Sequence, residues 1–172
     1  NMTALSSSGQ SKPFDKDKDG FMMTEGSATL VLEEMSSAQS RGANIYGEVL
    51  GSGSTADAHH ITAPAPGGDG ALRCMQLAIE DSGLASTDIA SVNAHGTSTP
   101  LNDAAEAEAL SKLFGEDGPP VTSTKGVTGH ALGAAGAIEA TAVLLSFLHK
   151  QIPPTAGFVN RDPEMAGFNI VT

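Results

Sequence analysis

The chain alternates between short apolar runs that end in small polar residues and longer segments whose apolar positions recur every three or four residues. The short runs predict buried β-strands, and the longer segments predict helices that pack on a sheet. Strands that alternate with helices of this length indicate parallel βαβ units, so we predict an α/β fold with a sheet covered on both faces. The predicted strands are 26–33, 45–50, 89–94, 120–123 and 168–171, and the predicted helices are 34–41, 69–82, 102–114 and 133–149.

Two polar segments interrupt this alternation. Residues 12–21 contain an Asp-x-Asp-x-Asp-Gly pattern that is typical of calcium loops. A loop of the EF-hand type that begins at Asp15 needs a bidentate Glu at its twelfth position, and that position is Gly26. We therefore expect a solvated turn and not a metal site. Residues 55–68 are too long and too polar for a simple connection, and they predict a binding loop.

Charge and cysteine content narrow the classes of function. The 172 residues have a net charge of −11 at pH 7 and only nine Lys and Arg, without a cluster, which argues against nucleic acid or an anionic membrane as a partner. The single Cys74 excludes an internal disulfide framework and a multi-cysteine zinc site. Nothing at the start resembles a secretory leader, so we expect a cytoplasmic protein, or an organellar one in a eukaryote.

The apolar segment 131–149 is long enough to cross a bilayer. Glu139 lies near its centre, where a carboxylate would cost about 2.5 to 3.5 kcal/mol in hydrocarbon. A buried helix of an α/β core is therefore favoured over a membrane span.

Two histidines follow predicted strands, where α/β proteins place their reactive groups. His95 comes directly after strand 89–94, and His130 follows strand 120–123 with Lys125 between them. Neutral imidazole donates one hydrogen bond and accepts another, so two of them can hold a carbonyl or enolate oxygen. From the residues alone, two interpretations are equally favoured: the histidines bind an oxygen together, or each only forms hydrogen bonds within its own turn.

Other kinds of site lack their motifs. The chain has no Gly-x-Ser-x-Gly elbow of a serine hydrolase and no His-Glu-x-x-His of a zinc hydrolase. Its glycines at 129, 133 and 136 match neither the dinucleotide pattern nor the phosphate loop.

Five motifs, in order along the chain, closely resemble the β-ketoacyl-acyl-carrier-protein synthases of the thiolase superfamily, and the ketosynthase II type most of all. They are Lys-Pro-Phe-Asp-Lys-Asp-Lys-Asp-Gly-Phe at 12–21, His-Gly-Thr-Ser-Thr at 95–99, Thr-Lys-Gly-Val-Thr-Gly-His at 124–130, Gly-Ala-Ala-Gly-Ala-Ile-Glu at 133–139 and Gln-Ile-Pro-Pro-Thr at 151–155.

The resemblance implies a thiolase-like layered α/β/α/β/α fold. Residues 1–42 would end the N-terminal half, and residues 43–172 would form most of a truncated C-terminal half. The implied reaction is a decarboxylative Claisen condensation in fatty-acid elongation, in which malonyl-carrier protein attacks an acyl group held on a cysteine. A polyketide ketosynthase, its chain-length partner without the cysteine, and an inactive fragment remain alternatives.

The resemblance also implies roles for individual residues. His95 and His130 would bind the malonyl thioester oxygen, while Lys125 and Glu139 would form a charged network that keeps the imidazoles neutral. The hydroxyls that bind the phosphopantetheine arm would be those of Thr97 and Thr99, with Thr62 at the entrance.

The family's nucleophilic cysteine has no counterpart in this chain, because Cys74 stands elsewhere and is expected to be a packing residue. We expect no metal and no resident cofactor, since the phosphopantetheine arrives on the acyl carrier protein. The complete protein is expected to be a homodimer.

Overall fold

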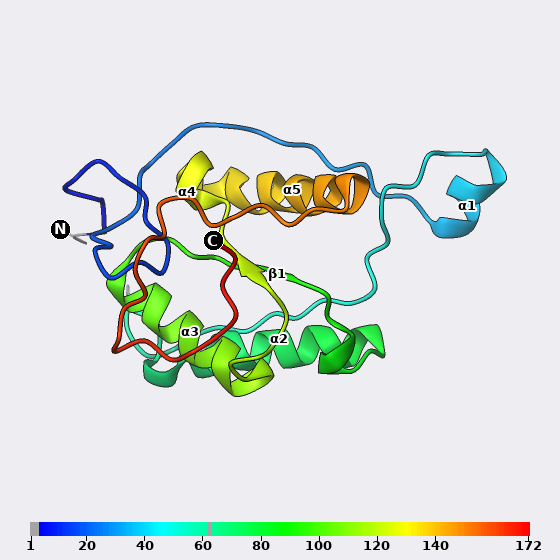
Figure 1. Ribbon diagram of the computed structural model, residues 1–172. Helices are drawn as coiled ribbons and strands as arrows, with labels where there is room; N and C mark the ends of the chain where they lie inside the picture. Colours follow the sequence, from blue (N-terminus) through cyan, green and yellow to red (C-terminus); the bar gives the residue numbers. More distant parts are fainter. Residues whose placement is uncertain (1–3, 62) are drawn as a thin grey trace.

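The body of the molecule is layered, with helices on both sides of a small parallel sheet. The computed structural model describes residues 4–61 and 63–172. Helix α5 (Ala135–His149) lies on one side of the sheet, and helices α2 (Asp69–Ser82) and α3 (Pro100–Phe114) lie together on the other (Figure 1). This arrangement agrees with the predicted α/β class.

The sheet is shorter than the apolar runs predicted. Strand β1 (Val92–Asn93) pairs in parallel with β2 (Val121–Thr122), and Val92 lies opposite Val121. The predicted strand at 168–171 adds only a parallel bridge between Ile170 and Val121. The carboxyl ends of β1 and β2 therefore lie side by side.

The helix predictions agree closely with the structure. Helix α2 has the predicted bounds, and α3 begins two residues early at Pro100, since a proline suits the first turn of a helix. Segment 34–41 forms α1 (Met35–Ser40), and the segment at 133–149 forms α5 after a 3₁₀ turn. The remaining helical turns of the described chain are α4 (Lys125–Thr128), η1 (Pro66–Gly68), η2 (Ser86–Asp88) and η3 (Leu132–Ala134).

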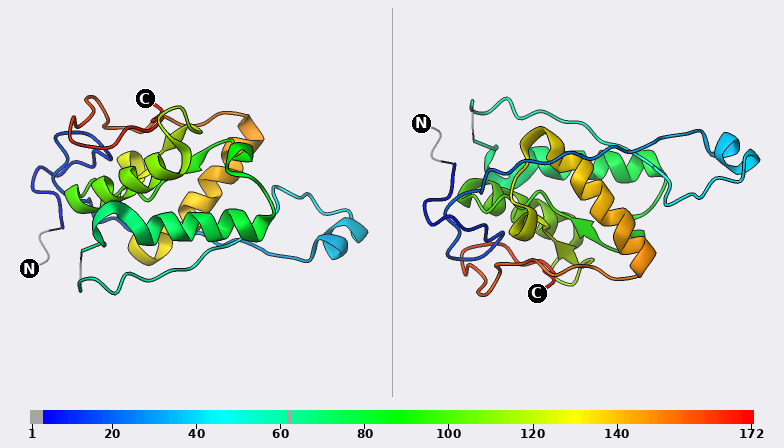
Figure 2. Two further views of the ribbon diagram at one scale, coloured as in Figure 1. Left: turned by 90° about the horizontal axis from the view of Figure 1, so that it is seen from below. Right: turned by 90° about the horizontal axis from the view of Figure 1, so that it is seen from above.

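The strands predicted at 26–33 and 45–50 are wrong for this chain. Both segments are extended, but neither pairs with a strand among the described residues. They run out from the body and back, with α1 at the tip (Figure 2). Their apolar side chains are exposed, and Val31 is 87% accessible. A strand needs a neighbour to satisfy its backbone, and the described chain supplies none at this place.

The expectation of a solvated turn at 12–21 is also wrong. Phe14 is 1% exposed and Asp15 is 2% exposed. The Asp15 carboxylate accepts the backbone N–H groups of Val159 and Asn160, at 2.7 and 2.8 Å, from the far end of the sequence. Burial works to raise the pKa of Asp15, but these hydrogen bonds outweigh it and hold the pKa below its usual value.

The hydrophobic core lies between α3 and the sheet. Phe14 and Phe168 meet edge to face there, with ring centroids 5.0 Å apart. The other core residues come from β2, the end of β1 and the inner face of α3, and they are Ala94, Ala107, Leu110 and Val121. The core thus joins the N-terminal turn to the segments that carry the predicted site.

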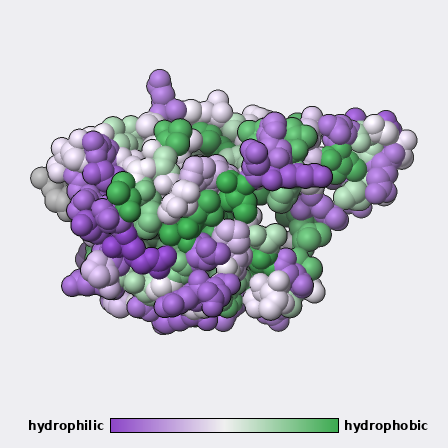
Figure 3. Space-filling view, viewed as in Figure 1, coloured by the Kyte–Doolittle hydropathy of each residue, from purple (hydrophilic) through white to green (hydrophobic). Residues whose placement is uncertain are grey.

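Helix α5 is far more accessible than expected for a core helix. By length and composition the segment Leu132–His149 passes as a candidate membrane span, and only 6% of it is buried. Figure 3 shows apolar residues reaching the surface of the body and of the projecting segments. Ala135 is the one buried residue of α5, a helix that is described along its whole length, so the expectation of a buried helix is wrong for this chain.

Candidate active site

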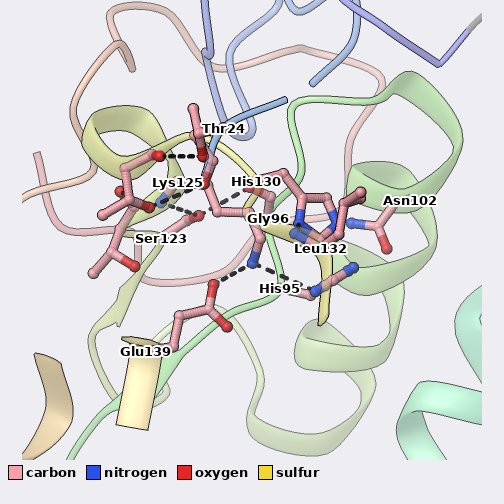
Figure 4. Close-up of polar contacts among 12 residues, drawn as sticks. Thr24, His95, Gly96, Asn102, Ser123, Lys125, His130, Leu132 and Glu139 are labelled. Atoms are coloured by element: carbon pink, nitrogen blue, oxygen red, sulfur yellow. Dashed lines mark hydrogen bonds and ion pairs between the residues drawn. The ribbon is translucent and has the colours of Figure 1, made fainter. Parts of the chain in front are cut away.

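The residues that follow the two parallel strands lie close together. The chain leaves β1 into His95, and it leaves β2 into the short helix α4, which begins at Lys125. Because the strands are neighbours, the Lys125 ammonium lies 3.5 Å from Nδ1 of His95 (Figure 4).

His130 is brought to the same place by the N-terminal part of the chain. Its backbone N–H donates to the carbonyl of Met22 at 2.7 Å, and its carbonyl accepts the N–H of Thr24 at 3.2 Å. The ring lies edge to face with that of His95, at a centroid distance of 5.3 Å and an angle of 88°. Phe21 also packs edge to face against the His130 ring, at a centroid distance of 5.1 Å.

Lys125 and Glu139 form an ion pair behind the histidines. The Lys125 side chain is 1% exposed and the Glu139 side chain is 17% exposed, and the two groups are in direct contact. A buried ammonium of this kind needs such a partner, because an uncompensated charge away from water is costly. The pair connects α4 to α5, and it fixes the cation beside His95.

The Nδ1 atom of each imidazole accepts a hydrogen bond. An ammonium has no lone pair, so Lys125 donates to Nδ1 of His95, whose proton must then reside on Nε2. The backbone N–H of Leu132 donates to Nδ1 of His130 at 3.2 Å, with the same consequence. Two neutral rings with Nε2–H groups are what an oxygen that gains negative charge requires.

The electrostatics keep both rings uncharged near neutral pH. Partial burial and then the positive charge of Lys125 lower the pKa of His95 to about 4, with a smaller effect of His130. Burial and Lys125 also lower the pKa of His130, although Glu139 acts against them. Imidazole must be neutral to accept the Lys125 and Leu132 hydrogens at Nδ1, so charge state and geometry agree.

The other predicted residues are less closely tied to the histidines. Thr97 is 5% exposed, and its hydroxyl is 2.8 Å from that of Thr99. Thr62 lies outside the described residues. Cys74 lies on α2, where its thiol donates to the carbonyl of Gly53 at 3.1 Å. Helix α2 does not carry either histidine of the site.

Sequence reasoning missed two carboxylates on α3 that hold the loops of the site. Glu106 accepts the backbone N–H groups of His95 and Gly96, and Asp103 accepts that of Phe14. Acidic residues near the start of a helix are also favoured by the helix dipole, so their presence there does not by itself indicate another role. Their spacing of three residues, which places them on one helix face, was the available signal. Among the described residues, no group of three or more His, Cys, Asp or Glu side chains lies close enough together to hold a metal ion.

Two family models match the chain. The model of the β-ketoacyl synthase C-terminal domain matches residues 46–159, and that of the β-ketoacyl synthase N-terminal domain matches residues 1–38. The chain belongs to the β-ketoacyl synthase family.

Curated relatives agree with this assignment. A 3-oxoacyl-[acyl-carrier-protein] synthase 2 from Synechocystis sp. is 51% identical over 156 residues, which are 90% of this chain and 38% of the relative. The enzyme of the same name from Staphylococcus aureus is 51% identical over 155 residues, which are 89% of this chain and 38% of the relative. The chain thus spans about two fifths of the length of these relatives.

Solved structures confirm the thiolase-like fold class. The ishigamide ketosynthase/chain length factor superposes with a TM-score of 0.92 at 40% identity, over 98% of this chain and 41% of the other. A type II polyketide ketosynthase in complex with its acyl-carrier protein, AntDE:AntF, gives a TM-score of 0.92 at 34% identity, over 98% and 44%. The division of this chain at residues 42 and 43 stays a prediction.

Proposed function

We propose that this chain is the C-terminal portion of a 3-oxoacyl-carrier-protein synthase that elongates fatty acids by decarboxylative condensation. The observation that supports it best is the pair of neutral imidazoles, His95 and His130, whose Nδ1 atoms both accept a hydrogen bond. Their Nε2–H groups form an oxyanion site for a thioester carbonyl. The relatives named as 3-oxoacyl-carrier-protein synthases support the choice of reaction.

The reaction follows from what such a site stabilises. When the bond between the malonyl α-carbon and its carboxylate breaks, carbon dioxide leaves and the electron pair passes to the α-carbon and the thioester oxygen. That oxygen then carries most of the negative charge, and two fixed N–H donors stabilise it without rearrangement. The carbanion attacks the acyl thioester held on the enzyme, and the cysteine thiolate departs. The cysteine is supplied by a part of the family's fold that this chain does not contain.

Lys125 and Glu139 act on the histidines and not on the substrate. The ammonium disfavours protonation of His95, so the ring is a neutral donor throughout the physiological range. Glu139 offsets the lysine charge and makes its burial tolerable. The network therefore sets the protonation state on which the oxyanion site depends.

The substrate arrives on an acyl carrier protein, and its phosphopantetheine arm is the only cofactor that we propose. One of the structural neighbours is a ketosynthase bound to its acyl-carrier protein, which supports this class of partner. Thr97 and Thr99 offer paired hydroxyls on the turn that carries His95, and Thr62 lies in the loop proposed to border the entrance. We also propose that the complete protein is a cytoplasmic homodimer.

The 172 residues alone are proposed to be inactive. They contain no cysteine in the position of the family nucleophile, and the extended segments around α1 and the apolar face of α5 are uncovered. Strands from the rest of the family's fold would pair with the extended segments. The same layer would cover α5 without a membrane.

A condensation assay tests the proposal. The complete protein is incubated with an acyl-carrier protein and malonyl-carrier protein, and mass spectrometry follows the β-ketoacyl product. We expect the complete protein to form this product and the isolated chain to form none. Condensation by the isolated chain would contradict the proposed inactivity, and no product from the complete protein would contradict the proposed reaction.

A polyketide ketosynthase is the second candidate, because two solved polyketide-type structures superpose on the chain over nearly its full length. The product of the condensation assay distinguishes the fatty-acid synthase from the polyketide ketosynthase. One elongation of a reduced acyl chain supports the fatty-acid interpretation, whereas successive condensations without reduction support the polyketide interpretation. A residue other than cysteine at the nucleophile position would indicate the chain-length partner.

A further inference from the structure

The segment between β1 and α3 contains a strained residue between its two threonines. Ser98 is fully buried and has a φ of +66°, in the left-handed region that residues other than glycine adopt at a cost. The hydroxyls of Thr97 and Thr99, on either side of it, are 2.8 Å apart. In an extended chain, residues two positions apart are separated by about 6.6 Å. The left-handed turn at Ser98 therefore brings the two hydroxyls into contact.

Paired hydroxyls suit a ligand that is made of amides and hydroxyls. One hydroxyl of Thr97 and Thr99 donates to the other, which leaves one hydroxyl proton and the remaining oxygen lone pairs for a ligand. A pantetheine arm carries two amides and a hydroxyl, and these groups need both donors and acceptors. The placement of the two threonine side chains therefore affects binding of the arm, and it depends on the conformation of Ser98.

Two hydrogen bonds from a distant part of the sequence hold Ser98 in this conformation. Its hydroxyl oxygen accepts the backbone N–H of Lys12 at 2.9 Å, and its carbonyl accepts the N–H of Gly20, also at 2.9 Å. Both donors belong to the N-terminal turn 12–21, so the side chain and the backbone of Ser98 are bound to one segment. A strained residue persists where its surroundings determine its conformation in this way.

The N-terminal turn is a firm support for these bonds, because it is itself attached to the C-terminal part of the chain. The Asp15 carboxylate accepts the two backbone N–H groups of residues 159 and 160, at 2.7 and 2.8 Å. The Lys18 ammonium pairs with Asp162 at 2.8 Å, and the Lys18 side chain is only 5% exposed. Hydrogen bonds that involve a charged group are stronger than neutral ones, so they fix the turn that holds Ser98.

We propose that Ser98 is a positioning residue for the pantetheine arm: it ties segment 97–99 to the N-terminal turn, so that the hydroxyls of Thr97 and Thr99 are presented together. Ser98 is buried and its hydroxyl already accepts the Lys12 N–H, so it acts through the threonines and does not contact the arm. Its effect on arm binding rests on the proposed function, whereas the tie between the two segments does not.

The test compares two Ser98 variants with a matched serine variant, all in the complete protein. Ser98→Ala keeps the Cβ atom and removes the acceptor of the Lys12 N–H. Ser98→Gly removes the same acceptor, but glycine adopts a positive φ without strain, so this variant is used as well in case Ser98→Ala unfolds the protein. The control is Ser82→Ala at the end of α2, because the Ser82 hydroxyl also accepts a backbone N–H, that of Leu84 at 3.2 Å.

The first readout is carbon dioxide release from two malonyl thioesters. Malonyl-pantetheine carries the amides and the hydroxyl of the arm, and the ethyl thioester of malonate carries none of them. For malonyl-pantetheine we expect KM to rise about 5- to 10-fold in both Ser98 variants, with kcat within about twofold, because about one hydrogen bond to the arm is lost. For the ethyl thioester we expect kcat/KM within about twofold of the wild-type value. A role of Ser98 in folding alone would change both substrates alike.

The second readout is the hydrogen exchange of the Lys12 amide, followed by NMR on protein that is isotope-labelled at lysine. The Lys12 N–H donates to the Ser98 hydroxyl, so loss of this acceptor should make its exchange about tenfold faster or more in both Ser98 variants. The exchange should be unchanged in Ser82→Ala.

Each outcome decides the proposal. An unchanged KM for malonyl-pantetheine in both Ser98 variants would overturn it, and so would an equal loss with the ethyl thioester or equal effects of Ser82→Ala. If the wild-type protein releases no carbon dioxide from either thioester, the proposed function fails. Faster exchange of the Lys12 amide in the Ser98 variants would then still support the tie between the two segments, and unchanged exchange would overturn it.

Discussion

Replacement of Lys125 by methionine removes the cation beside His95 while nearly conserving its volume. In the structure the ammonium is 3.5 Å from His95 Nδ1 and is one of the causes that lower the pKa of His95 from 6.5 to about 4. A full charge at that distance would contribute ~4.7 kcal/mol at an effective dielectric constant of about 20, or roughly 3.5 pH units. Burial is the larger cause of the shift from 6.5 to about 4, so Lys125 accounts for less than half of it. We therefore expect the pKa of His95 to rise by about one unit and to stay below 6.5.

Glu139 complicates the single variant, because it loses its partner. Removal of one member of a buried ion pair costs about 3 to 5 kcal/mol, and the lower end applies here since the Glu139 side chain is 17% exposed. The double variant Lys125→Met, Glu139→Gln removes both charges and should recover part of that stability. It also isolates the effect of burial on His95.

The assay is a histidine NMR titration of the complete protein and of both variants, with urea unfolding in parallel. In the single variant the negative Glu139 is also left unopposed, so His95 should titrate highest there and at an intermediate pH in the double variant. A His95 pKa that stays at about 4 in both would refute the assigned effect of Lys125. Equal stability of all three proteins would refute the assigned ion pair.

Two further substitutions test other parts of the structure. Thr97→Val should raise KM for malonyl-carrier protein about 5- to 10-fold, because one hydrogen bond to the substrate is lost, and it should change the thermal midpoint little. A loss of stability with KM unchanged would mean that Thr97 only supports the turn. Asp15→Asn should lower the free energy of unfolding by about 2 kcal/mol at pH 7, because one accepting oxygen is lost to backbone N–H groups. The folded-state pKa of Asp15 is below 3.8, so the stability from its carboxylate is present above that pH and is lost as pH falls through the folded value. The difference between the two proteins in urea unfolding should therefore shrink in acid, and a constant difference would contradict the role of the charge.

Local signals in the sequence were sufficient to predict the helices. Helix α2 stands at its predicted bounds because its apolar spacing and the stop at Gly83, which has a φ of +71°, are properties of neighbouring residues. The prediction of strands at 26–33 and 45–50 was wrong for the opposite reason. An apolar run predicts a tendency to pair, but pairing depends on a second strand that the described chain does not offer.

The candidate site was partly predictable. Two histidines after parallel strands implied a common edge, and the structure places their ring centroids 5.3 Å apart. The burial of Asp15 was not predictable, because its N–H donors are 144 and 145 residues away in the sequence. Glu106 was missed because its partners are main-chain amides, which every residue except proline has and no motif reveals.

The histidine pair itself is tested most directly by release of labelled carbon dioxide from malonyl-carrier protein. The complete protein is compared with His95→Ala and His130→Ala, each checked for folding by its thermal midpoint. Loss of one of two donors to the thioester oxygen should slow decarboxylation about 10²- to 10³-fold in either variant. Release at the wild-type rate from both folded variants would contradict the assignment of these two histidines as the oxyanion site.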